Sequence, residues 1–212
     1  MRSGSAIGAA PAAHPRPLEV EIDGLRLHAR LRGLWPAGAV RLRFGAPNGP
    51  SVIRNGLDWL LAGAAGAGLP LYEFQEDEDG DIGPHVRAPL EPAQARDALR
   101  LLLALRARGL REPLPFAPRS GWKFHTARTV EAGARAAAAQ WRGSERQWGE
   151  GTEPACELAL RARDPFADHA SLRDFAAVTT AVFAAVCNGI SLPPALDDDA
   201  LARVPLGEDD GA

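Results

Sequence analysis

Residues 18–45 alternate apolar and polar side chains, and this alternation constrains the fold more than any other feature. It recurs over 18–22, 25–31 and 40–44, and the dipeptide Asp23-Gly24 joins the first two segments. Asp-Gly is typical of the tight turns that close β-hairpins. Successive side chains of a strand point to opposite faces of a sheet. The pattern therefore predicts an antiparallel meander of three strands, with one face buried and the other lined by arginines.

Two of the next three segments have the apolar period of helices. Residues 51–68 carry an apolar stripe, with Ser51 as the expected N-cap, and residues 92–108 carry a second stripe. Pro92 suits the first turn of the second helix, and Gly109 suits its C-terminal end. Between the two helices, residues 69–74 are expected to form a strand.

An acidic stretch, EDEDGDIG at 76–83, follows that strand. Its spacing partly imitates an EF-hand calcium loop. The first and last ligands would then be Gln75 and Val86, and a bidentate Glu is required at the last position. We therefore interpret the stretch as a solvated hairpin tip.

The chain is organised around residues 110–150. A proline run leads into Arg119-Ser120, where Ser120 is predicted to cap a single alanine-rich helix that ends at residues 141–143, WRG. A Gly/Glu-rich connection at 148–151 follows. The tryptophans of this region offer large, rigid contact area, either to the core or to a partner.

The remaining segments complete one globular domain over residues 18–190. Residues 158–160 are expected to form a short strand, and a helix opening near Ser171 is expected to be buried. Residues 1–17 are predicted to be a flexible leader, or the interior of a longer protein entered midway. The acidic segment 191–212 is predicted to be a disordered tail.

Composition and motifs exclude several classes of function. The net charge of −3 gives no general basic footprint, although Lys123 is the only lysine among 24 basic residues. The sequence has no P-loop, no G-x-S-x-G, no H-E-x-x-H and no C-x-x-C, and its five histidines lack ligand spacing. No cofactor or metal is therefore expected. Without a secretory signal or a run of about 20 apolar residues, a cytoplasmic protein with no membrane span is the default.

The order of these elements and their local motifs resemble the C-terminal part of RecC, the gamma subunit of exodeoxyribonuclease V. The resemblance covers about residues 18–190, whereas the RecC family is several times longer, so this chain would be a C-terminal fragment. The motifs that carry it are IDG (22–24), LPFAPRSGW (114–122), WRG (141–143), GEG (149–151) and LRARDPF (160–166).

The resemblance implies an α/β fold, a PD-(D/E)XK nuclease-like mixed sheet with flanking helices whose catalytic residues are lost. An active member has an acid near the end of its second strand and D/E-x-K on its third, which bind Mg²⁺. Here Arg32 and Arg43 lie near the acidic positions and Gly45 near the lysine, and no carboxylate occurs from Leu25 to Ala46. We therefore predict no catalytic residue and no metal centre on these strands.

The resemblance further implies a non-catalytic scaffold and DNA-guiding domain in double-strand break repair and recombination. Its partners would be RecB-like and RecD-like subunits together with duplex and single-stranded DNA. Arginines on the strands could contact phosphates, and the central stretch could line a partner or DNA surface, although ion-paired or solvated arginines would give the same pattern. The candidate binding residues are Arg30, Arg32, Arg41, Arg43, Arg119, Ser120, Trp122, Trp141 and Arg142.

Two alternatives remain open from the sequence. One is an independent Mg²⁺-dependent DNA nuclease whose acids come from elsewhere, for example Glu150, Glu153 or Asp77. The other is a truncated remnant without a function.

Overall fold

The strand alternation near the N-terminus produces the predicted hairpin. The computed structural model describes residues 15–77 and 80–206. In it, β1 (Arg16–Ile22) pairs antiparallel with β2 (Leu25–Leu31). Asp23 and Gly24 both have positive φ, 50° and 81°, as a tight turn of this kind requires. The predicted flexible leader falls mostly on residues 1–14, outside the described residues, but Arg16 and Pro17 already belong to β1.

The third predicted strand does not extend this hairpin into a meander. Short β3 (Leu34–Trp35), β4 (Gly38–Leu42), β5 (Leu71–Glu76) and β6 (Ile82–Arg87) form a separate sheet in the order β3-β4-β5-β6. Strand β4 runs parallel to β5, and the other neighbours are antiparallel. The meander prediction is therefore wrong beyond β2, because β4 pairs with β3 and β5 and not with β2. Helix α1 (Gly49–Ala64) crosses over from β4 to β5, which makes this pair parallel.

Each early helix has an identifiable start. The side chain of Asn48 accepts from the N–H of Ser51, and the Ser51 hydroxyl oxygen accepts from the N–H of Asn48. Asn48 is therefore the N-cap of α1, and Ser51 completes a capping box. The N-cap therefore lies three residues before the predicted Ser51. Helix α2 (Pro92–Gly109) has nearly the predicted bounds, with Pro92 in its first turn.

Two expectations for the central stretch are wrong. Its single alanine-rich helix is two helices, α3 (Pro118–His125) and α4 (Val130–Arg142), and Thr129 caps the second. After the short strands β7 (Gly143–Ser144) and β8 (Gln147–Trp148) and a 3-10 turn, η1 (Glu150–Thr152), the predicted strand at 158–160 is part of helix α5 (Pro154–Leu160). Pro154 begins this helix, and the positive φ of Arg161 and Ala162 ends it.

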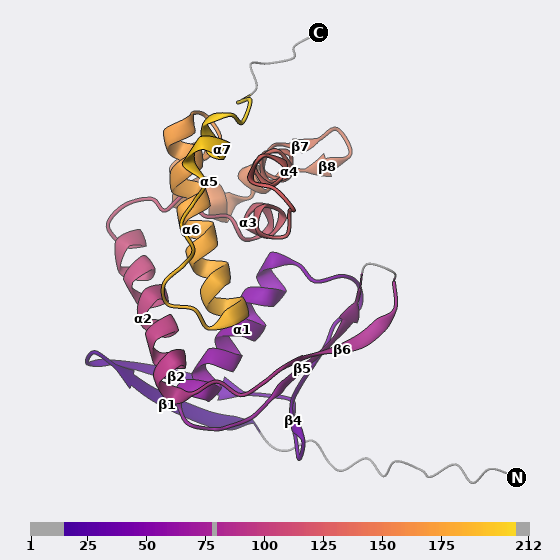
Figure 1. Ribbon diagram of the computed structural model, residues 1–212, viewed down its shortest axis with the longest axis vertical. Coiled ribbons are helices and arrows are strands. Elements are labelled where there is room, and N and C mark those ends of the chain that lie inside the picture. Colours follow the sequence, from indigo (N-terminus) through magenta and orange to yellow (C-terminus); the bar gives the residue numbers. More distant parts are fainter. Residues whose placement is uncertain (1–14, 78–79, 207–212) are drawn as a thin grey trace, which may run out of the picture.

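Helix α6 (His169–Asn188) joins the two halves of the molecule. Figure 1 shows β1, β2, β4, β5 and β6 at one end and α3, α4, α5 and α7 (Asp198–Ala202), with the short β7 and β8, at the other; α6 runs between the two ends. The helix is capped by Asp168, which accepts from the Ser171 N–H. Its predicted core positions Phe175, Val178 and Phe183 are all buried. One apolar core contains Phe183 and Val186, and the other contains Leu172 and Phe175.

Helix α6 is long and apolar enough to cross a membrane by length and composition alone. However, 61% of its most apolar window is buried inside the protein, where it contacts α1, α2 and α3. It is the core helix of a domain that looks water-soluble.

The segment expected to be a disordered tail is partly folded. Asp197 caps α7, and both Leu201 and Val204 are buried in the second core. Residues 207–212 lie outside the described residues. The run of aspartates that suggested disorder instead begins a short helix, where negative charge is favourable.

A buried ion pair connects β5 and β6 to the helices α1 and α6. The Arg87 Nε atom on β6 donates to Glu73 Oε2 on β5 at 2.6 Å, and Arg87 Nη1 donates to the carbonyl of Val186 on α6 at 2.6 Å. Asn55 on α1 donates to the other Glu73 oxygen at 2.8 Å. The guanidinium also lies 5.5 Å from the ring centre of Trp59. Both charged side chains are less than 10% exposed.

We expect Arg87→Ala to lower the free energy of unfolding by about 3–5 kcal/mol, because it leaves the Glu73 carboxylate buried without its partner. Urea denaturation measures the change. The matched control is Arg173→Ala, which breaks the exposed pair between Arg173 and Asp198 and should cost less than about 1 kcal/mol. Similar losses in the two variants would contradict this role for Arg87.

Candidate functional site

The arginines of β4 are bonded within the protein. Arg41 Nη2 lies 2.5 Å from Asp58 Oδ2 on α1, and Arg41 Nη1 donates to the carbonyl of Arg32 at 2.7 Å. Arg43 Nε donates to the carbonyl of Ala46 at 2.7 Å. Their neighbours on the opposite face, Leu42 and Phe44, are 76% and 93% exposed. At the end of β4 and directly after it, therefore, the two arginines bond within the protein, whereas Leu42 and Phe44 face solvent.

The four strand arginines consequently do not share one face. Arg30 and Arg32 come from the end of β2 and are exposed, and neither forms an ion pair within the part of the chain that the structure describes. Arg41 and Arg43 belong to or follow β4, in the other sheet, and are half-buried. Only the first two present free guanidinium groups to an external phosphate or carboxylate.

This region is unsuited to a divalent cation. No carboxylate occurs between Leu25 and Ala46, and Asp58, the carboxylate that reaches β4, is held by Arg41. Across residues 15–77 and 80–206, no group of three His, Cys, Asp or Glu side chains could hold a metal ion. The Arg41 guanidinium beside Asp58 would repel a divalent cation at this place.

A second cluster forms around Glu150, which is only 2% exposed. Its carboxylate accepts from the Arg119 N–H at 2.8 Å, from the Ser120 N–H at 2.6 Å and from Ser120 Oγ at 2.8 Å. The first N–H groups of a helix have no partner within it, and negative charge is favourable there. Glu150 therefore caps α3 from 30 residues away, and Ser120, predicted to be the cap, is a buried donor to it. We call this arrangement the Glu150 clamp.

The residues around Glu150 explain the glycines and the tryptophan of the central stretch. A Cβ on Gly149 would lie 2.4 Å from the Trp141 carbonyl, and one on Gly151 would lie 2.6 Å from the Trp141 ring. Only glycine permits these approaches. The motifs LPFAPRSGW, WRG and GEG thus meet at one place, where Trp141 is buried against Phe166.

The clamp determines which candidate residues can reach a partner. Ser120 and Trp141 are buried, and half-buried Trp122 donates to the Pro47 carbonyl at 3.1 Å and packs on Phe183. Arg119 pairs with Glu153 at 2.6 Å, and Arg142 lies 4.0 Å from Asp164, with about half of each guanidinium side chain exposed. The sequence singled out Trp148 together with Trp122 and Trp141 and favoured a core position for it, but Trp148 is 86% exposed.

The acids suggested for an independent nuclease form hydrogen bonds or ion pairs within the fold. Glu150 forms the clamp, Glu153 pairs with Arg119, and Asp77 accepts from the Asp81 N–H at 2.9 Å in the β5–β6 connection, as expected of a hairpin tip. Glu150 and Glu153 lie beside each other and Asp77 lies in the β5–β6 connection, and within residues 15–77 and 80–206 none of these acids belongs to a group of three that could hold a metal ion.

Burial also affects two cysteines and a histidine that could act as nucleophiles or as a base, Cys156, Cys187 and His125. Burial raises the pKa of the Cys187 thiol to about 11 and also raises the pKa of Cys156, so neither is an activated thiolate. His125 stacks on Phe183 at 5.0 Å between ring centres, and burial lowers its pKa. Its role is packing, without a carboxylate to orient it.

Comparison with protein families gives a match over the N-terminal part of the chain. Residues 2–129 match the family model described as the RecC C-terminal domain, which is more than half of the 212 residues. The match covers β1 to α3 and contains IDG and LPFAPRSGW; WRG, GEG and LRARDPF lie beyond it. No curated protein matches the chain.

We expect Glu150→Gln to lower the free energy of unfolding by about 3 kcal/mol, because α3 loses its charged acceptor and one buried donor is left without a partner. Chemical denaturation followed by tryptophan fluorescence measures the loss. Glu153→Gln, at the partly exposed neighbour, is the control and should cost less than about 1 kcal/mol. If the two variants are equally stable, the clamp does not hold α3.

Proposed function

The chain belongs to the RecC C-terminal domain family, and on that premise we propose that it is a non-catalytic subunit domain of a RecBCD-type helicase-nuclease, exodeoxyribonuclease V. In this role it is the C-terminal part of the gamma subunit and acts in the cytoplasm in double-strand break repair and recombination. It supports partner subunits and guides DNA, and it performs no chemistry of its own.

The Arg41–Asp58 ion pair is the observation that carries this proposal. A strand, a crossover helix and a parallel strand, here β4, α1 and β5, fit a PD-(D/E)XK nuclease-like core. In an active core, acids on the strands bind Mg²⁺ and polarise water. Here Arg41 lies on β4, two residues before Arg43, the residue that the resemblance places near the acidic position, and it binds Asp58. This pairing supports the proposal of a nuclease-like scaffold without a metal centre.

The proposed partners follow from the family. They are a RecB-like helicase-nuclease and a RecD-like helicase, with duplex and single-stranded DNA passing through the assembly. Arg30 and Arg32, which are exposed and without an ion-pair partner in the described chain, are the best candidates for phosphate contact. Such contacts would position DNA without reading its sequence. Arg119 and Arg142 are secondary candidates because both lie beside carboxylates.

The test is co-purification of the tagged chain with co-expressed RecB-like and RecD-like subunits from the same genome. We expect a stable complex with at least one of them. The isolated chain must first give a cooperative unfolding transition, so that failure to bind cannot be attributed to misfolding. A folded chain that captures neither subunit would contradict the proposal and favour a remnant without a partner.

A further inference from the structure

An apolar groove of about 430 Å³ lies among the β1–β2 hairpin, α1, α2 and α6. It is distinct from the Arg41–Asp58 pair and from the Glu150 clamp. Aliphatic side chains that are half-buried form most of its floor. Those from β2, α1 and α2 are Leu27, Ile53, Leu57, Leu61, Leu102 and Leu103. A floor of this kind offers contact area to apolar side chains and no hydrogen bond to a nucleotide.

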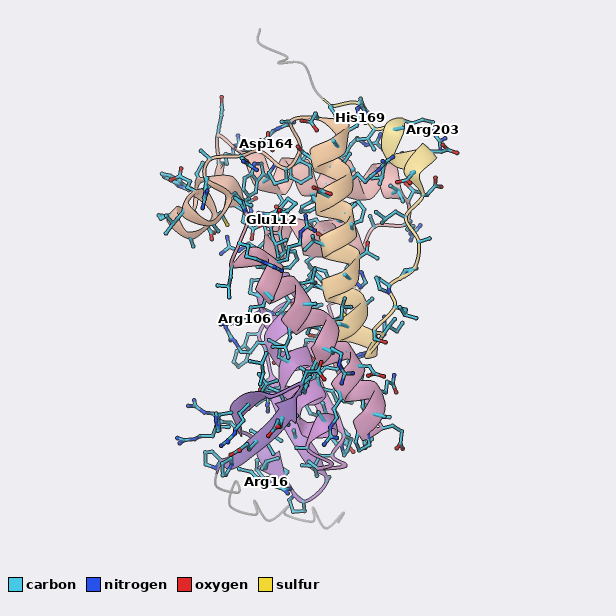
Figure 2. All side chains as sticks on the ribbon, turned by 90° about the vertical axis from the view of Figure 1, so that its left-hand side faces the viewer. Arg16, Arg106, Glu112, Asp164, His169 and Arg203 are labelled. Atoms are coloured by element: carbon cyan, nitrogen blue, oxygen red, sulfur yellow. The ribbon has the colours of Figure 1, made fainter. Side chains whose placement is uncertain are left out.

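Two arginines line the rim of the groove, Arg26 on β2 and Arg106 on α2, and no Asp or Glu lines it. His28 also lines it and lies 3.6 Å from Glu19. Arg26 and Arg106 are exposed and make no ion pair within residues 15–77 and 80–206. Nearby Arg100, by contrast, is paired with Asp23 at 2.7 Å. Figure 2 shows Arg106 at the edge of α2, above the hairpin.

We propose that this groove binds an amphipathic helix of a partner subunit, one with apolar anchors flanked by carboxylates. This inference rests on the proposed function and names the kind of segment that the subunit presents. Five of the six floor residues named above project from helices, whose side-chain ridges accept the i, i+3, i+4 and i+7 side chains of another helix. The unpaired arginines of the rim are complementary to acidic residues beside those anchors.

Charge reversal at the rim tests the proposal without disturbing the floor. Arg26→Glu with Arg106→Glu should weaken capture of the partner subunit at least 10-fold, because two attractive contacts become repulsive. The control changes the same net charge at Arg54→Glu with Arg96→Glu, exposed arginines of α1 and α2 that do not line the groove. The control should bind like the unmodified chain, and thermal unfolding should show that both variants remain folded.

A cross-link identifies the occupant. With benzoylphenylalanine in place of Arg106, irradiation of the assembled complex should label a partner segment with helical apolar spacing and flanking acidic residues. Labelling of a segment without those features, or of DNA, would overturn the proposal.

The outcomes separate this inference from the proposed function. If the unmodified chain captures no subunit, the proposed function fails. If it captures one and the rim variant captures that subunit equally well, the groove inference fails and the proposed function stands. If the rim variant loses only binding to forked DNA, the groove belongs to a DNA path, which also contradicts the inference.

Discussion

The Glu73–Arg87 ion pair is the interaction on which the relation between the two halves of the molecule depends. It joins β5 and β6 to each other, to α1 through Asn55, and to α6 through the Val186 carbonyl. At the same place α1 approaches α6 so closely that a Cβ on Gly56 would lie 2.3 Å from that carbonyl. Because leaving one of these buried charges without its partner would be costly, the ion pair opposes separation of these elements. The far end of α6 carries Phe175, so the position of the second core follows from the first.

Three carboxylates of the described residues form contacts within the fold. A metal-dependent nuclease needs carboxylates that are free to bind a cation. Asp58 holds Arg41, Glu73 holds Arg87, and Glu150 holds the N-terminus of α3. In each case a carboxylate, the kind of group that can bind a metal ion, makes a contact within the fold instead. The cations left free, including Arg26, Arg30 and Arg106, lie on the surface, where they can meet DNA or a partner.

The sequence predicted the local features well, because their causes are local. Asp23-Gly24 sets the hairpin turn, and the apolar stripe from Ala95 to Leu105, bounded by Pro92 and Gly109, sets α2. The parallel pairing of β4 with β5 was missed, because it depends on the path of α1 between them. Strand β6 was missed because Gly83 and Pro84 interrupt its pattern.

The sequence analysis singled out residues of the Glu150 clamp but not the contacts between them. The motifs around Ser120, Trp141 and Glu150 were singled out, but nothing local to Ser120 indicates that its partner is a carboxylate 30 residues later. The orientation of Arg41 was also not predictable, since alternation fixes only which side chains share a face. Arg41 shares its face of β4 with the buried Ala39 and pairs with Asp58 on the next helix.

The most direct measurement is DNA cleavage by the purified chain with Mg²⁺ or Mn²⁺, on linear duplex, forked and single-stranded substrates. A non-catalytic domain should leave all three intact at every metal concentration, while its cooperative unfolding shows that it is folded. Metal-dependent cleavage that co-purifies with the chain, and that disappears in the Asp58→Asn variant, would contradict the account. It would mean that the acid bound by Arg41 is available to a metal after all.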